Sequence, residues 1–268
     1  MKKKIIVSVF VSIVVIAAII VTAVVLSRKE PSSADDVRHD KTVTTPEGET
    51  LPLDYAGTED MLNGDVVDKY TDQDGNTYSY NKDGKNTSYA LNLDAYREKY
   101  YKYIDGEFDS IEEEKAVEIA SAELESRYGE YFDDMSLINV YQSKDDGSWH
   151  VYFAELLGEG DFIEGISCNA QVLADGTVAH SAIGGIPDFE GIGDEQVEGI
   201  TFDRIAGDFE EELNEKYGDK FISFDIDKIK LRNEHGRVVV VAFAWSRFWL
   251  NETQTDYGEE MITYELND

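Results

Sequence analysis

The segment SIEEEKAVEIASAELESRYG, residues 110–129, decides the fold expected for this chain. Its apolar residues recur three and four positions apart, which is the spacing of one face of an α-helix. Ser110 stands where an N-cap would, Glu113 takes the capping-box position, and Gly129 is a credible stop. The spacing therefore predicts an amphipathic helix that packs on another layer. The residues of its apolar face are Ala116, Ile119, Ala120 and Leu124.

The chain beyond this helix changes to a pattern of short strands. Runs of apolar and aromatic residues predict strands around 136–141, 149–157 and 163–173. Asp146-Gly147 and Asp175-Gly176 mark the turns, because both residue types tolerate left-handed backbone angles. A helix whose apolar face lies on an antiparallel sheet makes an α+β fold.

The same pattern returns after a fixed offset of 89 residues, without a gap. We expect a second helix over 201–217 and strands around 222–231, 238–249 and 261–266, with a turn at His235-Gly236. The sequence therefore predicts two related helix-on-sheet modules. The matching pairs are Ile111 and Ile200, Glu123 and Glu212, Leu124 and Leu213, Tyr128 and Tyr217, Gly129 and Gly218, Phe132 and Phe221, Gly147 and Gly236, and Val151 and Val240.

One strand of the second copy is apolar on both of its faces. Residues 238–248 alternate between a face with Trp245 and a face with small apolar residues. Apolar residues on both faces are typical of a strand that is covered on both sides, so we expect Trp245 to be buried. If a binding face uses exposed aromatic residues, the candidates are Trp149, Trp245, Phe248 and Trp249.

The opening helix of the first copy resembles that of PepSY domains. The similar residues are Ser110, Ile111, Glu114, Ala116, Ile119 and Ala120, followed by strands at 149–153 and 172–178. The resemblance covers roughly 108–182, within an expected module of 108–184. A degenerate copy spans 198–268, where Asp208-Phe209 replaces Ile119-Ala120. The resemblance implies a cystatin-like helix on a sheet and a role in binding or restraining peptidases at the cell envelope. It brings no catalytic residues.

The N-terminal region reads as a membrane anchor. Residues 5–26 form an uncharged run of 22 residues, long enough to span a bilayer as a helix. A cleavable signal peptide would have a shorter apolar region and a small-residue cleavage site. Residues 1–4, with three lysines, predict a cytoplasmic N-terminus and an extracellular C-terminal part. This start resembles exported proteins of low-GC Gram-positive bacteria.

Two segments lie between the anchor and the first module. Residues 27–65 are polar and contain three prolines, so we expect a flexible linker. Residues 66–107 predict a three-stranded meander, with Asp-Gly turns at 72–75 and 82–85, and a short helix. That helix carries the stripe Leu93, Tyr96, Tyr100 and Tyr103, a spacing typical of core packing.

The charge balance excludes one class of partner. The chain holds 56 acidic and 24 basic residues, a net charge of −32. Such a surface repels phosphate backbones, so nucleic-acid binding is not expected. Cationic partners would be attracted, although acidity also serves solubility.

No pattern in the sequence predicts a catalytic, cofactor or metal site. Asp72-x-Asp74-Gly75-Asn76 is a fragment of a calcium loop without its late glutamate, and a plain turn explains it. Cys168 lies in an apolar run and reads as a buried small hydrophobe, not as the partner of His39, His150, His180 or His235. Acid pairs that could serve a glycosidase are unavoidable in so acidic a chain. These pairs are Asp133-Asp134, Glu159 with Asp161, and Asp188 with Glu190.

The expected function is therefore non-catalytic binding or regulation at the cell envelope, with the membrane held through residues 5–26. An envelope protein or a peptidase is the expected partner. Two alternatives remain open: a calcium-binding surface protein, and an envelope hydrolase that uses paired carboxylates.

Overall fold

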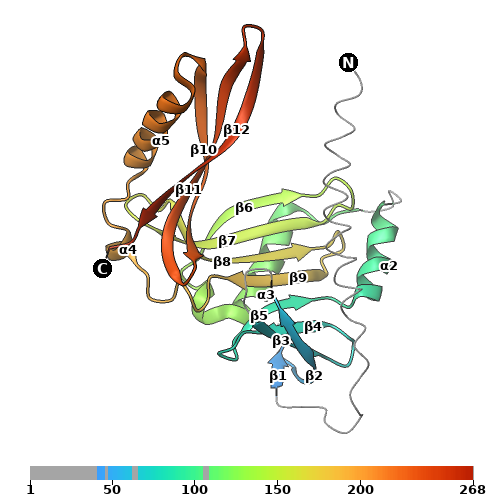
Figure 1. Cartoon of the computed structure of the whole chain (residues 1–268). Helices are drawn as coiled ribbons and strands as arrows, with labels where there is room; N and C mark the ends of the chain where they lie inside the picture. The colour runs from blue at the N-terminus through green and yellow to red at the C-terminus, as the bar shows by residue number, and fades with distance from the viewer. Residues whose placement is uncertain (1–40, 46–47, 62–65, 105–108, 268) are drawn as a thin grey trace. The chain divides into compact units, whose positions relative to one another are not determined.

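The computed structural model describes residues 41–45, 48–61, 66–104 and 109–267 (Figure 1). Helices and strands in these ranges form a sheet-rich α+β structure, as predicted. In chain order, the elements are β1 (Lys41–Thr44), β2 (Thr50–Asp60), β3 (Val66–Thr71), β4 (Thr77–Tyr80), β5 (Asn86–Ala90), α2 (Leu93–Ile104), α3 (Glu113–Phe132), β6 (Ser136–Gln142), β7 (Trp149–Leu157), β8 (Ile163–Val172), β9 (Val178–Gly184), α4 (Asp194–Val197), α5 (Phe202–Tyr217), a 3-10 turn (Gly218–Lys220), β10 (Phe221–Glu234), β11 (Arg237–Asn251) and β12 (Gln254–Glu265).

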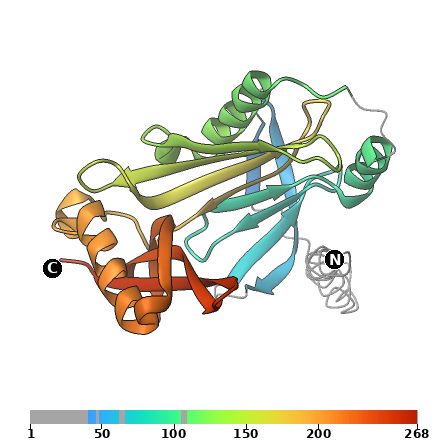
Figure 2. The same ribbon diagram turned by 90° about the horizontal axis from the view of Figure 1, so that it is seen from above.

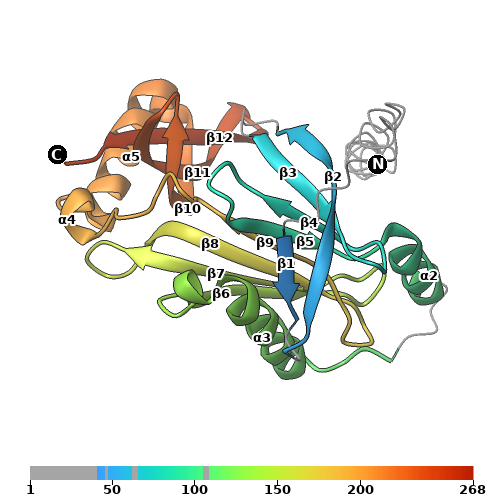
Figure 3. The same cartoon turned by 90° about the horizontal axis from the view of Figure 1, so that it is seen from below.

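The predicted meander is present as β3, β4 and β5, each antiparallel to the next. Its two turns place Gly75 and Gly84 at φ values of 78° and 77°, which glycine adopts without strain. Five tyrosines of β2 to β5 gather around Leu53. β5 pairs with β9 of the main sheet (Figure 3). The meander is thereby joined to the layer that α3 covers.

The prediction of a flexible linker over 27–65 is wrong for its second half. Two strands, β1 and β2, occupy most of residues 41–60; β1 pairs with β2, and β2 pairs with β3. Pro52 had suggested irregular chain, yet it pairs only with Thr42 of β1, in the part of β2 that has no second neighbour. Proline is tolerated there because its missing N–H faces no strand.

The predicted tyrosine helix is α2, and Tyr96 and Tyr103 of its stripe pack as core, whereas Leu93 is 49% exposed. Tyr103 is buried against Leu173, Ala174 and Ala179, and Tyr96 lies beside them. A polar contact fastens the same helix, because Lys99 Nζ donates to the carboxylate of Asp175 in the β8–β9 turn. α2 is therefore held on the sheet by apolar burial and by one ion pair.

The Asp175 carboxylate should make the docking of α2 pH-dependent. Burial favours a higher pKa for Asp175, but hydrogen bonds from Lys99 and Thr177 outweigh it and hold the pKa at about 2, below the ordinary 3.8. A lowered folded-state pKa contributes stability that is present above pH 3.8 and lost as the pH falls towards 2. The protection factors of the α2 amides, which correct for the intrinsic pH dependence of exchange, should therefore fall across this window in the wild type, and much less in Asp175→Asn. Asp219→Asn, an exposed acid, should behave as the wild type; equal behaviour of all three proteins would contradict the prediction.

The first long helix, α3, begins and ends later than predicted. Its N-cap is Glu112, and Ser110 instead donates its hydroxyl to the carbonyl of Gly147 at 3.0 Å. At the other end the helix passes Gly129 and reaches Phe132, with a kink at Tyr128 (φ −129°, ψ 23°). Tertiary contacts with the β6–β7 turn therefore take precedence over the local capping pattern.

Helix α3 covers one face of β7, β8 and β9 (Figure 2). Ala120 and Leu124 are fully buried in this layer, against Val151 and Phe153 of β7 and Cys168 of β8. These are residues of the face that the spacing predicts. The bounds of β7 agree with the predicted range, and β9 adds a fourth strand after β8.

The second copy forms a similar layer of α5 with β10, β11 and β12. Thr201 caps α5 by accepting from the N–H of Arg204, and Ile205, Phe209 and Leu213 line the buried face. These three residues lie 89 positions after Ala116, Ala120 and Leu124, which are also buried. The helix-then-strands order thus recurs, with four strands in the first copy and three in the second.

Both copies contribute to one sheet, which the sequence left open. The strands of the two copies meet at a single parallel pairing, Lys230 of β10 with Glu164 of β8. Phe162, Leu157 and Ile163, from the end of the β7–β8 hairpin, also enter the core beneath α5. The otherwise antiparallel sheet is therefore mixed.

The expected anchor at 5–26 lies outside the described residues, as does the short cytoplasmic segment. Within the ranges given above, no helix combines the length and the apolar character needed to span a membrane.

Candidate functional site

A cleft of ≈ 640 Å³ lies between the meander and the outer face of α3. The β3–β4 turn, the β1–β2 connection, α3 and the β8–β9 turn all contribute to its lining. We call it the meander cleft. These segments are far apart in the sequence and come together because β5 pairs with β9.

The charge of the meander cleft is strongly negative. Its described lining contains five carboxylates and one guanidinium, that of Arg127. Two tyrosines, Tyr78 and Tyr89, add aromatic surface. Such a site attracts a cationic group and repels an anion. The five acidic residues are Glu49, Asp72, Asp74, Glu118 and Glu123.

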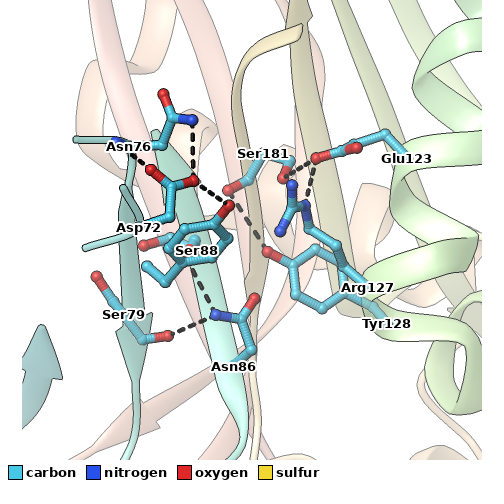
Figure 4. A network of polar contacts seen from close by, with 10 residues as sticks. Asp72, Asn76, Ser79, Asn86, Ser88, Glu123, Arg127, Tyr128 and Ser181 are labelled. Carbon is cyan, nitrogen blue, oxygen red and sulfur yellow. Dashed lines mark hydrogen bonds and ion pairs between the residues drawn. The ribbon is translucent and has the colours of Figure 1, made fainter. Parts of the chain in front are cut away.

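Asp72 shapes the β3–β4 turn. It is buried, and its carboxylate accepts four hydrogen bonds: from the N–H groups of Asp74 and Asn76, from Asn76 Nδ2 and from the Tyr78 hydroxyl (Figure 4). Burial, followed by the contact with Asp72, raises the pKa of Tyr78 well above 10.0. With its oxygens already engaged, Asp72 organises the turn and leaves Asp74 exposed at the rim.

This turn is also the fragment that resembled part of a calcium loop. No group of three or more His, Cys, Asp or Glu side chains that could hold a metal ion is found among the residues that the structure describes. The four donors on Asp72 explain the motif as an Asx turn.

Arg127 and Glu123 form a buried ion pair beside the cleft. Their side chains are 6% and 5% exposed, and Arg127 Nε donates to Glu123 Oε1. Burial disfavours the charged guanidinium, but Glu123 overcomes this, so the pKa of Arg127 is raised. The two residues are four positions apart on α3, the spacing that lets helical side chains meet.

The guanidinium of Arg127 also lies against the meander. Its centre is 4.1 Å from the ring centroid of Tyr89 and 5.2 Å from that of Tyr78. In Figure 4 it extends from α3 towards the β3–β4 turn, which carries Asp72, and β9, which carries Ser181. Burial raises the pKa of Tyr89 to about 12, so its ring stays neutral beside the cation. Nη1 of Arg127 is buried and has no hydrogen-bond partner in the described part of the chain.

The cysteine and the described histidines lie in packed or turn positions. Cys168 is 1% exposed, as predicted, and burial raises the pKa of its thiol to about 12. Burial lowers the pKa values of His150 and His180, and His235 occupies the β10–β11 turn. His39 lies outside the described residues.

The acid pairs singled out in the sequence are surface groups. Asp133, Asp134, Glu159, Asp161, Asp188 and Glu190 are all exposed. Asp188 accepts from Asn233, and Glu190 accepts from Lys85 and Tyr131. The contact with Lys85 lowers the pKa of Glu190, which is the opposite of what a general acid needs.

Of the aromatic candidates, two are largely exposed and two are packed. Trp149 donates its indole N–H to the carbonyl of Ile111, and Phe248 stacks on Tyr217 at 4.3 Å. Trp245 is 46% exposed and Trp249 is 42% exposed. The prediction that Trp245 is buried is therefore wrong: the face that Val239 and Val241 share with it is covered only over its first half.

Comparisons with known proteins leave the family open. No family model matches the chain, and no curated protein does. Among solved structures, the chain is similar to the Bacillus megaterium YpeB C-terminal domain, with 11% identity and a TM-score of 0.32. The match covers 81% of this chain and 88% of that one. A TM-score this low does not establish a shared fold, so membership of the PepSY family stays a prediction.

Proposed function

We propose that this protein is a non-catalytic binding module, held at the cell envelope by residues 5–26, whose meander cleft holds a basic segment of a partner protein. The observation that carries the proposal is the cleft itself: five carboxylates and two tyrosines around ≈ 640 Å³, beside a buried arginine with an unpartnered N–H.

The carboxylates of the cleft divide into two groups. Asp72 and Glu123 are buried and already engaged, by turn donors and by Arg127. Glu49, Asp74 and Glu118 are exposed at the rim. The inner pair fixes the shape, and the rim acids supply charge to an arriving cation. Glu118 also pairs with Lys115 on the same helix, at 2.8 Å. A fixed shape with a net negative rim suits binding better than proton transfer.

Arg127 indicates which chemical groups the ligand should carry. A buried donor without an acceptor costs on the order of 1–3 kcal/mol, so a ligand that supplies an acceptor would recover part of this. A peptide offers both required features: basic side chains for the rim acids, and backbone carbonyls for the guanidinium. A simple metal ion offers only charge.

Calorimetry with tetralysine amide, using the full-length chain, tests the proposal. Neutralising Asp74→Asn together with Glu118→Gln should weaken binding about tenfold, or on the order of 1.4 kcal/mol. Added salt should weaken binding to the wild type, because the rim charges are exposed to solvent.

The matched control neutralises Glu125 and Glu215, two exposed helical acids outside the cleft lining, as Glu125→Gln with Glu215→Gln. Both double variants change the net charge equally. Equal affinity of the two variants for tetralysine would contradict a site at the cleft. A pull-down from envelope extract would then identify the natural partner, which the resemblance to PepSY domains predicts to be a peptidase.

A further inference from the structure

The two copies differ in what lies beside the third strand of each copy, β8 in the first and β12 in the second. In the first copy, Cys168 of β8 pairs with Phe153 of β7. In the second, Ile262 of β12 pairs with Ala242 of β11, which lies 89 residues after Phe153. β12 therefore occupies the place of β8.

The strand that borders β8 has no counterpart in the second copy. β8 is flanked by β7 on one side and by β9 on the other, and β9 carries the meander. β12 pairs with β11, and with no other strand of the described chain. Its backbone groups on the outer side thus lie where β9 lies in the first copy, and alternate N–H and C=O groups point away from β11.

The residues of β12 indicate what could pair there. The strand carries Asp256, Glu259, Glu260 and Glu265, and no basic residue. Glu260 is buried and accepts from Lys216, Tyr217 and Ser246, whereas the other three are exposed. A second copy of β12 would bring four more carboxylates, and no cation, to this edge, and charges of one sign repel. A basic strand would not.

Exposed apolar side chains flank the same edge. Tyr257 is 61% exposed, Met261 is 48% exposed, and Trp245, which pairs with Glu259, is 46% exposed. They lie on the face of the sheet opposite α5. A partner strand would set alternate side chains beside Tyr257 and Met261, because side chains alternate across a strand.

We propose that the free edge of β12 binds an extended, basic segment of a partner protein by strand addition, in the position that β9 takes beside β8. Main-chain hydrogen bonds supply affinity in this mode, and alternate side chains supply specificity. The acids of β12 select a basic strand and disfavour pairing between copies, a known protection of edge strands.

Amide hydrogen exchange of the full-length chain tests this, with an alternating valine–lysine octapeptide as the probe. The outward amides between Tyr257 and Thr263 should exchange at least about tenfold more slowly with the peptide bound. The same peptide N-methylated on alternate residues should give no such protection, and neither should a valine–glutamate octapeptide. Equal protection by the N-methylated peptide, or no protection of β12 by the parent, overturns the proposal.

Charge-reversed variants complete the test. Glu259→Lys with Glu265→Lys should abolish the protection of β12, whereas Glu125→Lys with Glu215→Lys, which makes the same change in net charge on the helices, should retain it. Protection confined to the β3–β4 turn and α3 would assign the peptide to the meander cleft. That outcome would overturn strand addition while leaving the proposed function standing.

Discussion

Replacing Arg127 by methionine should lower the free energy of unfolding by about 3–5 kcal/mol, because it breaks a buried ion pair. The substitution leaves Glu123, 5% exposed, as a buried carboxylate without its cation. It also removes the cation from the ring of Tyr89. Total stability is typically about 5–15 kcal/mol, so the loss would be a large share. Urea unfolding of both proteins measures it.

The repeat provides a matched control for this experiment. Lys216 stands 89 residues after Arg127 and contacts Glu260, but its side chain is 48% exposed. After Lys216→Met, Glu260 would still accept from Tyr217 at 2.7 Å and Ser246 at 2.9 Å. The cost should therefore be about 1 kcal/mol or less. Replacing Glu123 and Arg127 together by leucine and methionine should recover most of the loss. Similar losses for Arg127→Met and Lys216→Met would contradict the buried-pair interpretation.

Leu124→Ala and Leu213→Ala should each cost about 2–5 kcal/mol, because each removes a fully packed side chain and leaves a cavity. The two leucines are 0% and 1% exposed and lie 89 residues apart, beneath α3 and α5. The end of the β7–β8 hairpin is shared with the core under α5, so both substitutions should shift one common unfolding transition.

Circular dichroism and amide exchange, followed over the same urea series, distinguish common from separate unfolding. Leu137→Ala is the control, since this leucine of β6 is 46% exposed and its truncation should cost about 0.5 kcal/mol or less. Two separate transitions in the Leu213→Ala variant, with the first copy unaffected, would show that the copies unfold independently.

The parts of the fold that the sequence predicts are those with strong local signals. α5 has a capping threonine and a regular apolar face, and its start was placed within one residue. The Asp-Gly turns of the meander and the His235-Gly236 turn, where both residues have positive φ, were predicted because few residues accept those angles. The start of α3 differs from the predicted one because the contact of Ser110 with the β6–β7 turn is not visible in the local sequence pattern.

The meander cleft could not be predicted from the sequence. It needs Glu49, Asp72 and Glu118 side by side, and they meet only through the three-residue pairing of β5 with β9. The sequences of β5 and β9 do not indicate that these two strands pair. Arg127 carried a weak signal, its spacing from Glu123, but nothing indicated that this pair is buried rather than solvated. The sequence pattern does not predict β2, because Pro52 suggests a tether.

The placement of the indole side chains has a practical consequence for optical experiments. All three tryptophans lie on β7 and β11, and β1 to β5 carry tyrosines instead. Indole emission therefore reports on β7 and β11 and does not report on the meander. A protein with Trp245→Phe and Trp249→Phe would keep Trp149 as its single indole, half-buried beside α3. The wavelength of its emission maximum would then report on the unfolding of the first copy alone.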